Sequence, residues 1–177
     1  MSQFIDNIIK LISGNFVAQL IGVILIPIIT RLYSPEALGE LQLFISVLSI
    51  KVIFSCLSYQ FSIMLPDRDE DSANIFVLCI ILIIIISILC LTIVSFASDW
   101  IGETLNAPGL SSYLYYLPLA VFLNSIFMLM NYWLSRKSEF GVISAANVVY
   151  SISLKAVQIK AGISYATAQG LILGIIL

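Results

Sequence analysis

Long apolar runs alternate with short polar segments along the whole chain. The first run breaks at a charged, proline-containing joint, PIITRLYSPEALGE (27–40), and a second apolar run begins immediately after it. About 20 apolar residues are enough for a helix to span the ~30 Å hydrocarbon core of a bilayer. The pattern predicts membrane spans at about 11–33, 41–65, 73–98, 112–135 and 141–159, with a sixth, incomplete span at 163–177.

Composition supports this interpretation. Hydrophobic residues make up 60% of the chain and charged residues 10%, with a mean hydropathy of +1.09, whereas soluble domains are about 25% charged. We therefore expect an all-α integral membrane protein, a multi-span helical bundle whose residues 1–177 form a single transmembrane lobe. Its eight Lys and Arg residues are dispersed and form no basic stripe, which excludes nucleic acid as a partner.

Loop charges predict how the chain is threaded. The first apolar run is too long for a signal peptide and no small-residue cleavage site follows it, so it is expected to remain as the first span. Cytoplasmic loops of membrane proteins are richer in Lys and Arg than outer loops. A cytoplasmic N-terminus gives four inner cations and two outer ones: Lys10, Arg68, Arg136 and Lys137 inside, and Arg31 and Lys160 outside.

Two serines have the sequence context of helix caps. Ser34 precedes Pro35, which costs no hydrogen bond at the first position of a helix, so a helical turn is expected to start there. Ser72 directly precedes the third apolar run and is expected to cap that span.

Polar residues recur at helical spacing inside four of the predicted spans, and such residues share one face of a helix. The stripes are Asn15, Gln19, Gly22 and Thr30 in the first span, Lys51, Ser55, Ser58 and Ser62 in the second, Asn124, Asn131 and Ser135 in the fourth, and Ser144, Asn147, Ser151, Lys155, Gln158 and Gly162 in the fifth. Membrane bundles use small and polar residues of this kind to hold helices together. For the serines and glycines, helix packing is the favoured interpretation over transport.

The lysines in these stripes need a further explanation, because a charge at the bilayer centre costs at least ~2.5–3.5 kcal/mol on insertion scales. No Asp or Glu lies inside any predicted span. Lys51 is expected near the midplane, where it faces water, an anion or an acid elsewhere in the protein. Lys155 lies nearer the outer end of its span, where snorkelling is an equal alternative. Arg31 fits an interfacial anchor better than a binding site.

Catalytic and metal chemistry have little support in the sequence. The loop PDRDED (66–71) places four acids around Arg68, but they crowd consecutively and no second acidic cluster completes a metal site, so a solvated loop is the better interpretation. The chain has no histidine and no nucleophile beside a base. We expect no enzyme activity, no metal and no cofactor.

Four segments in order resemble the N-terminal half of the polysaccharide biosynthesis (Wzx-type) membrane proteins of the multidrug/oligosaccharidyl-lipid/polysaccharide exporter superfamily. They are PIITRLYSPEALGELQLF, LSYQFSIMLPDRDEDSANIF, NYWLSRKSEFGVISAANVVYSISLKAVQIKAG and GLILG. Within the first segment, Pro35, Glu36 and Gly39 match the family's joint between its first helices, which implies a structural role.

The resemblance implies a multi-pass flippase of the bacterial inner membrane. Such a protein moves undecaprenyl-diphosphate-linked oligosaccharide, an O-antigen, lipopolysaccharide or capsule unit, across the membrane by alternating access. Its fold would be MATE-like, with two six-helix lobes of which this chain supplies the first. Implied partners are the lipid-linked oligosaccharide, membrane lipid, and either a C-terminal lobe or polysaccharide polymerisation proteins. In this scheme Lys51 and Lys155 line the cavity, as candidates alongside Arg31, Gln19, Asn15, Asn124 and Asn131.

Two alternatives stay open. A drug or cation antiporter of the same superfamily needs a membrane-embedded carboxylate, and the predicted span interiors hold cations and amides instead. Because the chain ends inside an apolar run, a fragment or truncated gene product is also expected, and one lobe alone would be a non-transporting membrane fragment.

Overall fold

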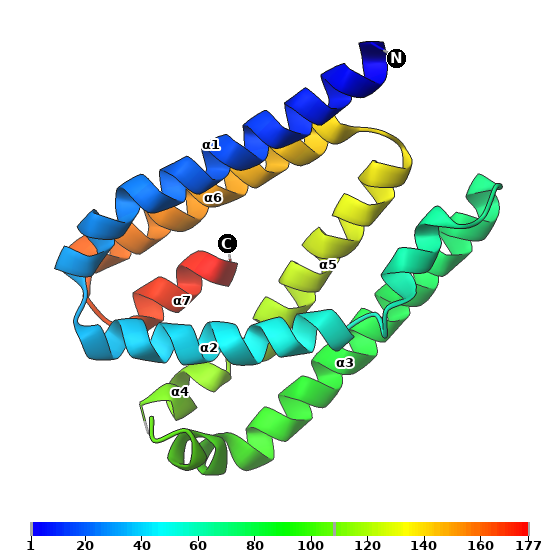
Figure 1. The fold of residues 1–177 in the computed structure, drawn as a ribbon. Coiled ribbons are helices and arrows are strands. Elements are labelled where there is room, and N and C mark those ends of the chain that lie inside the picture. The colour runs from blue at the N-terminus through cyan, green and yellow to red at the C-terminus, as the bar shows by residue number, and fades with distance from the viewer. Residues whose placement is uncertain (1, 108, 177) are drawn as a thin grey trace. The chain divides into compact units, whose positions relative to one another are not determined.

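The computed structural model describes residues 2–107 and 109–176, and every regular element within these ranges is a helix. Five of the helices there are long and apolar enough to cross a membrane: α1 (Ser2–Leu32), α2 (Pro35–Phe54), α3 (Asp69–Thr104), α5 (Leu117–Arg136) and α6 (Phe140–Ser164) (Figure 1). Shorter helices in the same ranges are η1 (Tyr59–Met64), α4 (Leu110–Leu114) and α7 (Ala168–Ile176). The all-α membrane fold expected from the sequence is confirmed. Leu177, the expected end of the sixth span, lies outside the described residues.

The helices fall into two compact units. The first unit contains α1, the start of α2, the end of α5, α6 and most of α7 (residues 2–38 and 133–175). The second unit contains the rest of α2, η1, α3, α4 and most of α5 (residues 39–132).

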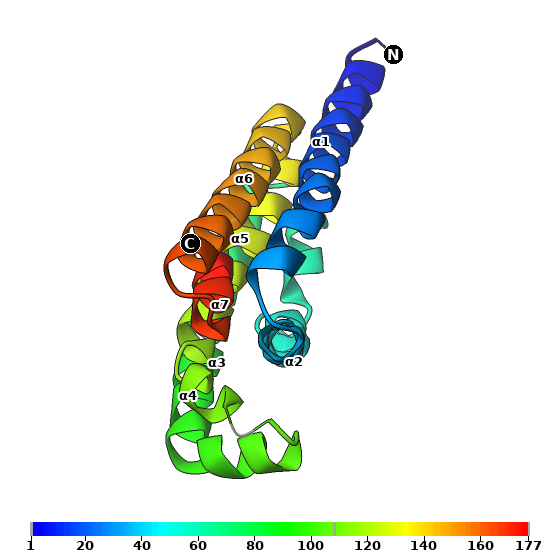
Figure 2. The ribbon, with the colours of Figure 1, turned by 90° about the vertical axis from the view of Figure 1, so that its left-hand side faces the viewer.

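In the first unit, α1 and α6 pack side by side and run in the same direction (Figures 1 and 2). Three other spanning helices, α2, α3 and α5, lie between them in the sequence. A chain that crosses a membrane at every span reverses direction each time, so its first and fifth spans must be parallel. The observed pairing of α1 with α6 therefore agrees with a chain that crosses the membrane at each of these helices.

The joint between α1 and α2 forms as the sequence predicts. The backbone N–H of Ala37 donates to Ser34 Oγ at 3.3 Å, and the N–H of Leu38 donates to the Ser34 carbonyl at 3.1 Å. Pro35 is the first residue of α2, where its missing N–H has no consequence. The helix then continues without interruption to Phe54. Glu40, which the expected boundary at Leu41 leaves in the loop, consequently lies in the second turn of α2 and is half-buried.

The second helix ends earlier than the apolar pattern indicates. Leu57 and Ser58 adopt left-handed backbone conformations, with φ of 47° and 66°, which an L-residue continuing an α-helix does not adopt. Lys51 therefore lies in the last turn of α2 instead of the middle of a longer span. The expected polar stripe does not form on one helix, because the chain leaves α2 before three of its members, Ser55, Ser58 and Ser62.

After this break, η1 packs back against α3. The acidic residues of the loop provide the first turn of α3, which begins at Asp69 and includes Glu70 and Asp71, where negative charge is stabilised by the helix dipole. The prediction that Ser72 caps this helix is wrong. Ser72 lies inside α3, fully buried, and its hydroxyl donates to the Ile63 carbonyl of η1 at 3.0 Å.

The fourth predicted span is divided in the structure. The short helix α4 contacts α3 and ends at Leu114, and α5 begins at Leu117 after a turn. Pro118 occupies the first turn of α5, where its missing N–H is tolerated. The N–H of Ala120 donates to the Tyr116 carbonyl at 3.0 Å and starts the helical pattern.

Candidate functional site

The polar stripes of α1 and α6 meet inside the first unit. Asn147 Nδ2 donates to Asn15 Oδ1 at 2.9 Å, and both side chains are half-buried. An amide pair of this kind has no competing water in hydrocarbon, so it favours helix association. The polar stripes of α1 and α6 thus face one another, and Asn15 contributes to the contact between these two helices.

That contact gives a direct test of the packing. A double-mutant cycle with Asn15→Ala and Asn147→Ala is expected to give a coupling of about 0.6 kcal/mol, the average measured for such pairs in a membrane protein, and at most about 1.7 kcal/mol. Unfolding of the purified protein in detergent measures it. Asn74→Ala, at an exposed position of α3, combined with Asn147→Ala serves as the control and should show additivity. Additivity of the Asn15 and Asn147 changes would contradict the contact.

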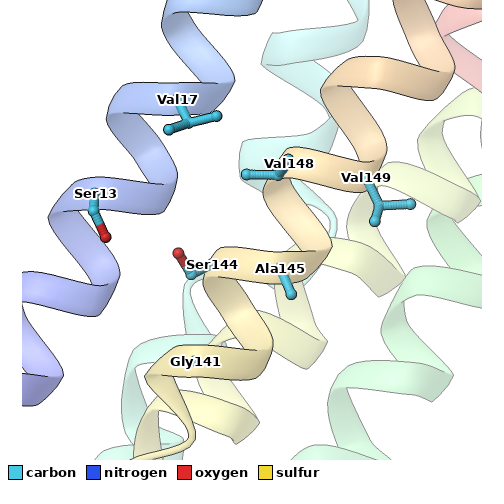
Figure 3. A pocket seen from close by; sticks show the side chains of 7 residues that line it. All are labelled: Ser13, Val17, Gly141, Ser144, Ala145, Val148 and Val149. Atoms are coloured by element: carbon cyan, nitrogen blue, oxygen red, sulfur yellow. The ribbon is translucent and has the colours of Figure 1, made fainter.

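Beside the amide pair, α1 and α6 line an open groove with a volume of about 440 Å³. Its lining comprises Ser13 and Val17 from α1, with Gly141, Ser144, Ala145, Val148 and Val149 from α6 (Figure 3). The hydroxyl groups of Ser13 and Ser144 are directed toward the space between the two helices, near Gly141 (Figure 3). Ser144 is buried, whereas Val17 and Val149 are exposed. The lining of the groove is mainly apolar, and its two hydroxyl groups lie toward the start of α6.

At the other end of the same helix pair, Gln158 of α6 is the centre of a hydrogen-bonded cluster. Its backbone carbonyl accepts a hydrogen bond of 2.6 Å from the Tyr33 hydroxyl, and its Nε2 donates to the Leu171 carbonyl of α7 at 3.2 Å. Lys155 Nζ donates to Gln158 Oε1 at 3.3 Å. Lys155, half-buried, is thus held on a neutral amide oxygen, so its positive charge is not cancelled by this contact.

Tyr33 belongs to this cluster and lies in the joint between the spanning helices α1 and α2. Only 4% of its surface is exposed, and burial raises the pKa of its phenol. The hydroxyl therefore keeps its proton across the physiological pH range and remains a donor to the Gln158 carbonyl. Through this bond the joint after α1 is attached to α6.

Three glycines make room for the cluster. A Cβ at Gly162 would lie 2.8 Å from Tyr33 Cε2, and one at Gly170 would lie 2.5 Å from Ala161 Cβ and 3.1 Å from the Tyr33 hydroxyl. At Gly174 it would lie 2.7 Å from Gln158 Cγ. Real Cβ atoms do not approach other atoms this closely, so only glycine allows α7 and Tyr33 to pack against α6 in this way.

The other predicted residues of the first unit lie outside these contacts. Gln19 is exposed on α1. Arg31 is exposed in the last turn of α1, beside a hollow that it lines with Pro27, Ile28 and Leu32. The role of Arg31 as an interfacial anchor stays a prediction.

The remaining candidates belong to the second unit. Lys51 is half-buried near the end of α2. Asn124 Nδ2 donates to the Ala120 carbonyl at 3.0 Å, and Asn131 Nδ2 donates to the Phe127 carbonyl at 2.8 Å, so both amides bond to the preceding turn of their own helix. The structure therefore groups Asn15 and Lys155 with the first unit and Lys51, Asn124 and Asn131 with the second.

The joint residues differ in what packing requires of them. Pro35 begins α2 and Glu36 adds a negative charge to its first turn, where the helix dipole favours it. A Cβ at Gly39 would meet nothing within 4 Å. Packing therefore does not require glycine at that position, and the structural role of Gly39 stays a prediction.

Sequence analysis missed Tyr33, Ser13 and the packing role of Gly170 and Gly174. A signal was present in the segment GLILG (170–174), whose glycines are four residues apart and hence on one face of a helix. Small residues at this spacing are typical of close helix contacts in membranes.

This fold defines a class of protein, the multi-pass helical membrane proteins with polar residues at their internal helix contacts. Comparison with family profiles matches residues 4–161 to the family described as polysaccharide biosynthesis protein. The match extends from the start of α1 almost to the end of α6, and the chain belongs to this family. Its general role is therefore that of a transporter-type membrane protein in polysaccharide biosynthesis or export. Comparisons with curated proteins and with solved structures gave no significant match.

Proposed function

We propose that this protein takes part in flipping a lipid-linked oligosaccharide, carried on undecaprenyl diphosphate, across the bacterial inner membrane. The main support for the proposal is the family match. The match covers all five candidate spanning helices except for the last residues of α6. A polysaccharide exporter of this kind must carry a polar, charged head group through hydrocarbon. Alternating access to a cavity supplies a path that never exposes the head group to lipid.

The charge of Lys155 supports this substrate class. A diphosphate loses its hydration on entering the membrane, and a cation that already lies there offsets part of that loss. The recorded partner of the Lys155 ammonium within the described residues is Gln158 Oε1, a neutral atom. The lysine thus keeps a net positive charge that an anionic head group can meet. We assign Lys51, half-buried at the end of α2, the same role in the second unit.

We also propose a cytoplasmic N-terminus. The parallel packing of α1 and α6 supports placing the start of α6 on the same side as the start of α1. Arg136 and Lys137 precede α6, and Lys10 lies near the start of α1, whereas Arg31 and Lys160 lie toward the other ends of these helices. More cations on the N-terminal side favour that side as cytoplasmic. Substrate would then enter from the side where α1 and α6 begin.

Deletion of the gene from its bacterial host tests the proposal. We expect surface polysaccharide to be lost while the lipid-linked oligosaccharide accumulates on the cytoplasmic face, because synthesis continues and transfer stops. Mass spectrometry of extracted lipids and accessibility of the sugar to external enzymes measure both effects. A plasmid copy should restore export. Absence of the lipid-linked unit in the deletion strain would assign the protein to synthesis, and unchanged surface polysaccharide would contradict the proposal.

A further inference from the structure

Gln158 has an unusual environment for a glutamine in a membrane helix. It is 3% exposed, and each polar atom of its side chain has a partner: Oε1 accepts from Lys155, and Nε2 donates to the Leu171 carbonyl. A buried amide with both ends satisfied has a fixed orientation, because rotating it by half a turn would place two donors, or two acceptors, against one another. The side chain therefore connects a charged group on α6 with the backbone of α7.

The packing around Gln158 fixes the same geometry independently. The Cα of Gly174 faces the side chain so closely that an added Cβ would lie 2.7 Å from Gln158 Cγ and 3.0 Å from the Leu154 carbonyl oxygen. On the other side, the Tyr33 hydroxyl holds the Gln158 carbonyl at 2.6 Å. Displacement of α7 would consequently remove both the Leu171 hydrogen bond and the Gly174 contact, and would release the atom that holds Lys155.

We propose that Gln158 is a positioning residue that fixes the Lys155 ammonium in relation to α7 without neutralising it. The inference rests on the proposed function and adds a specificity element to it. An acidic residue at this position would hold the lysine equally well but would cancel the charge offered to an anionic head group. Glutamine provides the acceptor oxygen and leaves the charge available. The position of α7 thus determines whether the cation is held in place.

The alternative is that Gln158 only stabilises the packing of α6 with α7. The two roles differ in their response to Gln158→Glu. This change keeps an oxygen for Lys155 and is nearly equal in size, but it converts the contact into an ion pair and replaces the Nε2 donor to the Leu171 carbonyl with a second acceptor oxygen. A packing role predicts that export follows stability, whereas a positioning role predicts that export falls when the charge is cancelled, even in a stable protein.

The first measurement is a thermal-unfolding cycle of the purified full-length protein with Gln158→Glu, Lys155→Met and the double variant. We expect Gln158→Glu to lower Tm somewhat when Lys155 is present, because the hydrogen bond to the Leu171 carbonyl is lost, and to lower Tm by about 4 °C more when Lys155 is replaced, in line with coupling energies between contacting residues. Additive effects would overturn the contact itself. This result does not depend on what the protein transports.

The second measurement is export by the same variants in the deletion strain, at matched amounts of membrane protein. We expect Gln158→Glu to lower surface polysaccharide at least about tenfold, and Gln158→Leu, which adds no charge, to lower it less. Gln42→Glu, at an exposed position of α2, is the matched control and should export normally. Normal export by Gln158→Glu would overturn the positioning role, as would export that falls only in proportion to Tm across the variants. If Gln158→Glu does not accumulate in the membrane, the thermal-unfolding cycle is measured with Gln158→Leu and Lys155→Met instead. Additive effects in that cycle would overturn the contact. If deletion of the gene leaves polysaccharide unchanged while the thermal cycle shows coupling, the proposed function fails and the Lys155–Gln158 contact stands.

Discussion

Replacing Gly162 with alanine is expected to destabilise the protein by about 2–4 kcal/mol. The new Cβ would lie 2.8 Å from Tyr33 Cε2, 3.1 Å from Tyr33 Cζ and 3.2 Å from Leu32 Cβ. Forcing a methyl group into a packed site costs about 1–3 kcal/mol, and the Tyr33 hydroxyl, displaced from the Gln158 carbonyl, loses a hydrogen bond worth about 1 kcal/mol. Thermal unfolding in detergent should show Tm lower by several degrees, at about 2–4 °C per kcal/mol.

Gly22→Ala is the matched control for this experiment. Gly22 also lies within a spanning helix, but a Cβ there would meet nothing within 4 Å. Alanine in a helix is favoured over glycine by about 0.5–1 kcal/mol, so Tm should stay the same or rise. Equal losses at both positions would show that the close approach of Tyr33 to α6 is not what makes Gly162 necessary.

Lys155→Ala is expected to lower export at least about tenfold without loss of the protein from the membrane. Hydrogen bonds to charged groups contribute about 1.5–3 kcal/mol, and each 1.4 kcal/mol corresponds to a factor of ten. Lys155→Arg keeps the charge but presents a planar group of different shape, so export should be reduced less. Surface polysaccharide in the deletion strain, normalised to protein in the membrane, measures the effect.

Lys160 provides the control for charge. It is an exposed lysine on the same helix, and Lys160→Ala removes an equal charge from α6. Export should be nearly unchanged, because an exposed cation at the membrane surface is hydrated and screened. An equal decrease for both lysines would point to orientation or insertion of α6 as the cause, and normal export by Lys155→Ala would remove Lys155 from the proposed pathway.

Hydropathy predicts the number and approximate position of the long helices because each must supply enough apolar surface to cross hydrocarbon. The polar stripes also carry real spatial information. Asn15 and Asn147 belong to polar stripes on two separate predicted spans, and their side chains bond to one another. Parallel packing of α1 with α6 also follows from the sequence, because spans that reverse direction at every crossing make the first and the fifth span parallel.

The end of α2 could not be predicted in this way. The segment between Phe54 and Tyr59, SCLS, contains no charged residue, glycine or proline, so no strong local signal marks the break. The left-handed residues Leu57 and Ser58 are held there by tertiary contacts, since η1 folds back on α3 and Ser72 bonds to Ile63. Lys51 lies in the last turn of α2 because of this break, and its expected position near the bilayer midplane stays a prediction.

The Gln158 cluster depends on contacts between segments distant in sequence. Gln158 is recognisable as part of a stripe, but its partner on α7 is a backbone carbonyl, and any residue has one. Tyr33 resembles the many aromatic residues found at membrane surfaces. Only the close approach allowed by the glycines at 162, 170 and 174 brings these groups together.

The length of α3 has a consequence for the membrane around it. Its 36 residues extend ~54 Å, and the uncharged stretch from Ser72 to Ser98 alone extends ~40 Å, beyond the ~30 Å of an average hydrocarbon core. Acidic residues bound this stretch at both ends, Asp71 before it and Asp99 after it, and neither can enter lipid cheaply. To keep the apolar residues of this stretch within hydrocarbon, α3 must incline by about 40° from the bilayer normal or thicken the lipid around it. Hydrophobic mismatch thus makes α3 the helix whose angle responds most directly to membrane thickness.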